Sequence, residues 1–212
     1  MKNLSFFVFF CFLCATTFTT RAQDDVAADT LKWSISGEKL TITGTGAMPD
    51  YEYPAHAPWY SYQEFITEVF IDYGITNIGI AAFADFSALK SITIPASVTK
   101  ISDGAFSFCE GLLSVTIPNA VKTIGDGAFF GCSSLTSLTI PRLVSTIGIG
   151  AFYDCTGLTK IINRATKPQV IDDNAFDGLD KTTCTLYVPA ASKVSYRTAK
   201  GWKDFVNIKN AI

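Results

Sequence analysis

An apolar motif recurs with a 23-residue period through the middle of the chain. Four isoleucines mark the repeat, and an Ala-Phe pair follows each of them after a short constant interval; the isoleucines are Ile78, Ile101, Ile124 and Ile147. The first three copies continue into a segment of the form Leu-x-x-Ile-x-Ile-Pro, with Val or Leu at some apolar positions. A fixed period of about 20 to 50 residues is typical of a solenoid, because one unit cannot bury its apolar face alone and stacked units form a continuous core.

The segment before each proline has the alternation of a strand with one buried face. In residues 89–95, Ile92 and Ile94 are expected to point inward, while Ser91 and Thr93 point outward. Proline has no N–H to donate to a strand ladder, so each strand is expected to end at the proline. Stacked copies then place their strands side by side and parallel.

The repeat extends beyond the four regular copies. Upstream, the apolar spacing continues to Ile66, and downstream a last copy ends at Pro189 after an insertion of one residue. The ladder therefore has about six rungs. The Ala-Phe pair is expected to form a tight helical turn whose ring fills the gap between rungs. The sequence thus predicts a β-rich solenoid with a 23-residue period and a parallel strand ladder.

Both ends of such a ladder need a cap, because an open end exposes core surface and unpaired strand edges. Apolar residues alternate in 31–35 and again in 40–42 after Gly37, which predicts an N-terminal hairpin cap. Near the other end, residues 191–200 contain neither glycine nor proline, so we expect a short helix that Gly201 stops.

The first residues of the chain are typical of a secretory signal peptide. Lys2 precedes an apolar run over 4–15, and small residues before Gln23 permit a cut after Ala22. A membrane span is disfavoured, because the run is shorter than the roughly 20 residues that a bilayer requires; a lipid anchor at Cys14 is disfavoured by its neighbours. The predicted organisation is a signal peptide at 1–22, an N-terminal cap at 23–65, leucine-rich repeats at 66–189 and a C-terminal cap at 190–212.

Composition and charge narrow the class of partner. The chain is 48% hydrophobic and 17% charged, which favours a folded protein over a disordered one. Without residues 1–22 it has 15 basic and 19 acidic residues, a net charge of −4. A mildly acidic chain without a Lys/Arg run is not expected to bind nucleic acid or an anionic membrane surface.

The repeat, written LxxIxIPxxVxxIGxxAFxxCxxL, resembles the BspA-type (Treponema-type) leucine-rich repeat of bacterial surface proteins. Segments around Trp33 and Trp202 resemble the caps of that family. The fourth and fifth copies depart from the pattern, with Asn163 at an isoleucine position and Leu179 at a cysteine position. The resemblance implies a secreted or surface-attached protein that adheres to host matrix proteins or to other cells.

Residue types that carry enzymatic or metal chemistry are sparse. His56 is the only histidine, and it stands between two prolines rather than beside a nucleophile, so a catalytic triad is disfavoured. Cys109, Cys132 and Cys155 recur with the period of the repeat and lack the short spacing typical of zinc ligands. We expect a buried column of free thiols rather than disulfides, because parallel side chains hold the sulfurs slightly too far apart. Neither a metal nor a cofactor is expected.

Two surfaces are candidates for binding. The first is the outward face of the strand ladder, with small uncharged side chains and one lysine: Ser91, Thr93, Ser114, Thr116, Ser137, Thr139 and Lys160. Their residue types are also explained by strand propensity alone. The second is an aromatic cluster whose rings could stack on sugars: Tyr51, Tyr53, Trp59, Tyr60 and Tyr62. These rings could instead cover the first rung, which the family resemblance favours.

The sequence therefore predicts a secreted or bacterial cell-surface binding module rather than an enzyme. Its expected ligand is a protein or a glycan on a host or neighbouring cell, contacted through the strand face. Three alternatives from other classes stay open: glycan binding through the aromatic cluster, a structural role as a spacer in a surface assembly, and an enzyme.

Overall fold

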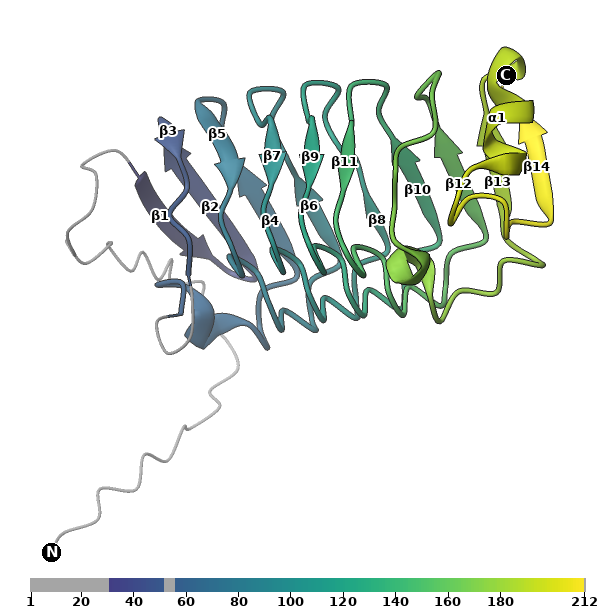
Figure 1. Cartoon of the computed structure of the whole chain (residues 1–212). Coiled ribbons are helices and arrows are strands. Elements are labelled where there is room, and N and C mark those ends of the chain that lie inside the picture. The colour runs from purple at the N-terminus through teal and green to yellow at the C-terminus, as the bar shows by residue number, and fades with distance from the viewer. Residues whose placement is uncertain (1–30, 52–55, 212) are drawn as a thin grey trace, which may run out of the picture.

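The structure, a computed structural model, describes residues 31–51 and 56–211. The predicted signal peptide, the first residues of the N-terminal cap and Tyr53 lie outside the described residues. Within them the chain forms a solenoid whose rungs stack side by side from β1 at one end to α1 and β14 at the other (Figure 1).

The predicted parallel ladder is present, and it falls into two sheets. The first sheet has the order β1-β2-β4-β6-β8, with the strands β1 (Leu31–Ser36), β2 (Lys39–Gly44), β4 (Glu68–Ile71), β6 (Ser91–Thr93) and β8 (Ser114–Val115). The second sheet has the order β10-β12-β13-β14, with the strands β10 (Ser137–Ile140), β12 (Lys160–Asn163), β13 (Thr185–Val188) and β14 (Asn207–Asn210). All pairs after the β1–β2 hairpin are parallel.

A further parallel ladder, which the sequence analysis did not anticipate, forms another side of the solenoid. Its order is β11-β9-β7-β5-β3, with the strands β3 (Gly46–Ala47), β5 (Ile75–Ile78), β7 (Lys100–Ile101), β9 (Thr123–Ile124) and β11 (Thr146–Ile147). The repeated isoleucine of each copy is its buried residue, as at Ile101 and Ile124. Most of these strands are too short to produce a visible alternation in the sequence.

The Ala-Phe turns join successive rungs through the backbone. The Phe106 N–H donates to the Ala128 carbonyl at 2.8 Å, and the Phe129 N–H donates to the Ala151 carbonyl at 2.8 Å. The expected helical turn is found in the fifth copy, as the 3₁₀ helix η2 (Asp173–Phe176). The first four copies form hydrogen-bonded turns instead.

The phenylalanines of these turns form one buried column along the axis of the solenoid. Their rings stack at centroid distances of 5.2 to 5.4 Å and within 17° of parallel, in the order Phe83, Phe106, Phe129, Phe152, Phe176. Trp59 stacks on Phe83 at one end, and Trp202 packs against Phe176 at the other. The prediction that each ring fills the gap between rungs is confirmed.

The glycines of the IGxG motif have two distinct roles. At Gly148 a Cβ atom would lie 2.5 Å from the backbone carbon of Gly125, so any side chain would force the rungs apart. Gly127 has φ of +56°, a conformation that residues with a Cβ rarely adopt. The motif therefore permits close stacking at one position and a left-handed turn at the other.

The caps have the predicted form. The β1–β2 hairpin has Gly37 in its turn at φ of +60°, and η1 (Tyr60–Tyr62) follows it. At the C-terminal end, η3 (Ala190–Ser192) leads into α1 (Lys193–Thr198), and Gly201 follows with φ of +75°. In the described part of the chain, no helix reaches the length and apolarity that crossing a bilayer demands.

The departure in the fourth copy is accommodated by a buried polar network. Asn163, which takes the place of an isoleucine, is fully buried. Its amide nitrogen donates to Gln169 Oε1 at 2.8 Å, and Gln169 Nε2 donates to the Val144 carbonyl at 2.9 Å. Trp202 Nε1 donates to the Gln169 carbonyl at 2.9 Å. These bonds tie the irregular loop to both the repeat core and the C-terminal cap.

Candidate binding site on the strand face

The outward strand positions line up within each sheet, as the sequence predicted. Strand pairing places Ser91 beside Ser114, and Thr93 beside Phe70 of the preceding rung. In the second sheet Ser137 pairs with Lys160. Of the seven candidate residues six are exposed, and Thr139 is partly exposed. The strand face, defined by these seven residues, is therefore an ordered array that faces solvent.

The six hydroxyl groups of the strand face have no hydrogen-bond partner among the described residues. Some hydroxyls elsewhere in the repeat are used differently. Thr99 Oγ1 donates to the Thr76 carbonyl at 3.2 Å, and Thr159 Oγ1 donates to the Thr136 carbonyl at 3.3 Å, in each case bracing one rung against the rung before it. The strand face thus keeps its donors and acceptors available to a ligand.

Charged and aromatic residues flank this hydroxyl zone on both sides. On the N-terminal side, Lys39 Nζ forms a 2.6 Å ion pair with Glu68 and lies 5.4 Å from the centre of the Phe70 ring. On the C-terminal side, Lys160 Nζ lies 5.3 Å from the centre of the Tyr187 ring. The sequence analysis missed Phe70 and Tyr187, although they stand in the same column as the threonines.

The strand face is interrupted between β8 and β10, where the first sheet ends and the second begins. The backbone contact between these rungs is long: the Thr136 N–H donates to the Leu113 carbonyl at 3.4 Å, whereas the Thr159 N–H of the next rung donates to Thr136 at 3.1 Å. Beyond the strands, Pro141 has no N–H to donate to Ile117. The two sheets are therefore only weakly joined through the backbone at this point.

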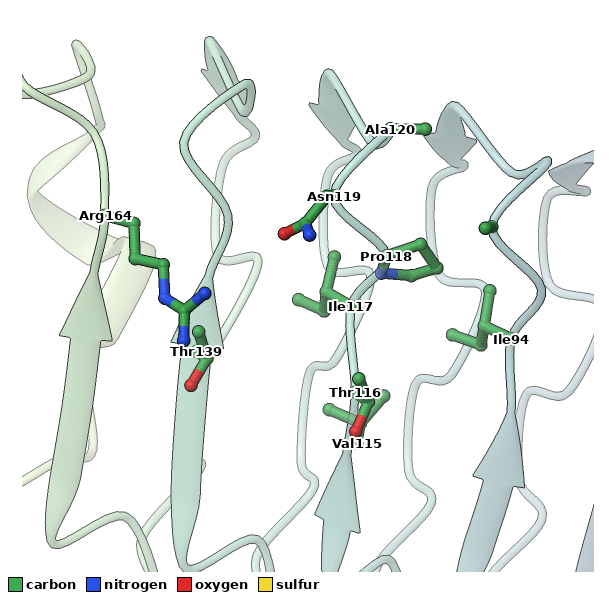
Figure 2. Close-up of a pocket in the computed structure, with 10 residues that line it drawn as sticks. Ile94, Val115, Thr116, Ile117, Pro118, Asn119, Ala120, Thr139 and Arg164 are labelled. Carbon is green, nitrogen blue, oxygen red and sulfur yellow. The ribbon is translucent and has the colours of Figure 1, made fainter.

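A groove of about 650 Å³ lies at this interruption. Its lining includes Thr116 and Thr139 of the strand face, the apolar residues Ile117 and Pro118, and Arg164. Figure 2 shows Arg164 reaching from its own rung toward Thr139, while Asn119 points toward the same space from the opposite side. The sequence analysis did not predict this groove.

The inward residues beside the groove stay buried. Val115 and Ile117 are 7% and 4% exposed, and Ile92 and Ile94 at the matching positions of the preceding rung are 8% and 9% exposed. Ile117 and Pro118 line the groove, so a ligand that enters it meets apolar side chains.

The described residues of the aromatic cluster cover the first rung of the repeat. Trp59 is fully buried, and its Nε1 donates to the Ala82 carbonyl at 2.8 Å. Tyr51 packs against Trp59, and burial raises the pKa of its hydroxyl above the ordinary value. Tyr60 and Tyr62 are partly exposed, and Tyr60 stacks on His56 at 3.9 Å. Trp59 is consequently shielded from a ligand, and the partly exposed rings are Tyr51, Tyr60 and Tyr62.

The cysteines form a buried column of free thiols, as predicted. Cys109, Cys132 and Cys155 donate through Sγ to the Phe83, Phe106 and Phe129 carbonyls at 3.1 to 3.2 Å. Burial raises the pKa of the Cys155 thiol to about 12. The structure adds Cys184, also free and buried. Across residues 31–51 and 56–211, no three His, Cys, Asp or Glu side chains gather as a metal site requires.

A smaller hollow lies away from the strand face, lined by Asp85, Ser87, Phe108 and Glu110. Phe108 is 44% exposed and begins a partly exposed aromatic row that continues through Phe130 and Tyr153. The sequence analysis did not single out these rings, because they vary between aromatic and other residues from copy to copy.

Comparisons with known proteins agree with this architecture. A leucine-rich repeat protein from Eubacterium ventriosum is 32% identical, covering 69% of this chain and 43% of its own length, with a TM-score of 0.50. The leucine-rich repeat protein of T. pallidum is 19% identical over 89% of this chain and 83% of its own, with a TM-score of 0.53. The pneumococcal vaccine antigen PcpA is 21% identical, covering 78% of this chain and 41% of its own length, with a TM-score of 0.57.

The likenesses to the T. pallidum and pneumococcal proteins, at such low identity, concern the fold alone. The chain spans less than half the length of the Eubacterium ventriosum and pneumococcal proteins. A comparison with curated protein sequences finds no match. The model of the BspA type leucine rich repeat region matches residues 58–183 in six copies, which is more than half of the chain. The chain therefore belongs to the BspA-type leucine-rich repeat family.

Proposed function

We propose that this chain is a secreted or cell-surface binding protein without enzymatic activity, which adheres through its strand face to a protein on a host or neighbouring cell. Residues 1–22 direct its export in this proposal. The family supports this location, because BspA-type repeat proteins are typically found at the bacterial surface or secreted.

The observation that carries the proposal is the ordered row of hydroxyl groups on the strand face. The hydroxyls of Thr99 and Thr159 brace neighbouring rungs, whereas the six hydroxyls on the strand face have no partner among the described residues. Hydroxyls in ordered rows bind water until a ligand displaces it, and a ligand that replaces those water contacts gains specificity from the fixed spacing.

The proposal is tested by binding of the purified chain to immobilised matrix proteins and to a glycan array. The test variant carries Thr116→Arg and Thr139→Arg, which add bulk and charge in the middle of the strand face. The matched control carries Thr76→Arg and Thr146→Arg, two exposed threonines of the other ladder.

We expect the test variant to lose at least about tenfold in affinity for a matrix protein, while the control binds as the unmodified chain does. Both variants should remain folded, since exposed substitutions usually change stability by less than about 0.5 kcal/mol. Equal binding by the test variant and the unmodified chain would contradict the proposal. Binding to glycans alone, abolished by Tyr60→Ala or Tyr62→Ala, would move the site to the aromatic cluster.

A further inference from the structure

The groove between β8 and β10 lies beside a backbone carbonyl, that of Ile117, which accepts no backbone hydrogen bond from the described residues. The Ile140 carbonyl accepts a hydrogen bond from the backbone of the next rung, at Arg164. The Ile117 carbonyl occupies the same position one repeat earlier. The residue of the next rung that matches Arg164 there is Pro141, which has no N–H to donate. An extended peptide carries N–H groups along its whole length, and one of them can donate to this carbonyl.

The charge around the groove is positive. Arg164 is exposed, and it is the one charged residue among the described residues that line the groove. It takes no part in the ion pairs Lys39–Glu68 and Lys181–Asp177. The four strands of the second sheet contain Lys160 and Lys209 but no aspartate or glutamate. This local excess contrasts with the chain as a whole, whose net charge is −2.

We infer that this groove binds an extended acidic segment of the partner protein, with a carboxylate against Arg164 and an apolar neighbour against Ile117 and Pro118. The inference rests on the proposed function, and it assigns the chemistry of the ligand. Arginine holds a carboxylate through two parallel N–H donors, which gives direction as well as attraction. Asn119 supplies an amide to the same space from the other side (Figure 2).

A peptide suits the groove better than an acidic sugar for two reasons. The floor is apolar, with Ile94, Ile117 and Pro118 in the lining, and it would leave sugar hydroxyls without partners. The unused acceptor is the Ile117 backbone carbonyl, and a backbone N–H group of an extended peptide is the donor that it lacks.

The test is selection from a displayed library of linear heptapeptides on the purified chain. We expect peptides enriched in aspartate or glutamate beside an apolar residue. Synthetic versions with blocked ends should lose about tenfold or more in affinity when the acid is changed to its amide, or when Arg164→Gln is introduced. Arg164→Lys should restore part of that loss. Arg142→Gln, an exposed neighbour outside the groove lining, is the control and should have no effect.

Comparing peptides with free and amidated C-termini separates a side-chain carboxylate from a terminal one. A library that returns no peptides, or peptides without a carboxylate, overturns the inference. So does Arg164-dependent binding of an acidic oligosaccharide in place of a peptide. If Arg164→Gln leaves binding of a matrix protein unchanged while Ser91→Arg with Ser114→Arg, two strand-face residues outside the groove lining, abolishes it, the strand face is the binding site and the groove has no part in it.

Discussion

Replacing Phe129 with alanine removes one ring from the middle of the buried column. The Phe129 side chain is fully buried, and its ring stacks on Phe106 at 5.2 Å and on Phe152 at 5.4 Å. Burial of such a side chain stabilises a protein by roughly 1.5–3 kcal/mol. Each stacked pair adds about 0.5–1.5 kcal/mol, so the expected loss is about 3–5 kcal/mol, as for other buried phenylalanines.

The adjacent residue provides a matched control. Phe130 is partly exposed, and its ring stacks on Tyr153 at 4.9 Å outside the core column. Phe130→Ala leaves no enclosed cavity, and we expect it to cost at most about 2 kcal/mol. The two variants therefore compare the same chemical change at neighbouring positions of different burial.

Urea unfolding, followed by far-UV circular dichroism and by tryptophan fluorescence, measures both losses. Trp59 and Trp202 lie at opposite ends of the solenoid, so coincident transitions from the two signals justify a single free energy of unfolding. A Phe129→Ala variant within about 0.5 kcal/mol of the unmodified chain, or one that is more stable than Phe130→Ala, would refute the stacking register described above.

Three further predictions follow from buried groups. Ser102 Oγ is buried without a hydrogen-bond partner among the described residues, so Ser102→Ala should stabilise the chain by about 1 kcal/mol in the same assay; a loss of stability would contradict this. Asn163→Ile should destabilise the chain by about 1–3 kcal/mol, because it leaves the buried amide of Gln169 short of a partner, and a gain would show that the network is dispensable. Maleimide should label Cys132 slowly at pH 8 until urea is added, because burial raises the pKa of its thiol and the thiolate is the reactive form; rapid labelling of the folded chain would place it at the surface.

Much of the architecture could be predicted because the repeat turns sequence spacing into spatial contact. Residues one period apart stack directly, so the phenylalanine column and the cysteine column followed from counting alone. The hairpin turn at Gly37 and the end of the C-terminal helix before Gly201 could be predicted because glycine readily adopts the positive φ found at both positions. Each of these features depends on one type of residue at a fixed position of the chain. Such a position can be recognised from a single sequence.

Other features depend on how two different residues meet, and these were missed. The ladder of β3, β5, β7, β9 and β11 rests mostly on strands too short for a periodic signal. The groove had a signal that was available in the sequence: Arg164 follows three prolines in the same column, and it restores the N–H that they lack. The pairing of Asn163 with Gln169 joins a repeat position to a loop, and no spacing rule predicts such a contact.

Hydrogen exchange of the backbone amides, with and without a matrix protein that the chain binds, tests the central claim most directly. If the strand face is the binding surface, exchange should slow in β6, β8 and β10, around Thr116 and Thr139, and stay unchanged in β5, β7 and β9 on the other ladder. Protection confined to the region of Tyr60 to Tyr62, or to the other ladder, would contradict the claim and place the site elsewhere on the solenoid.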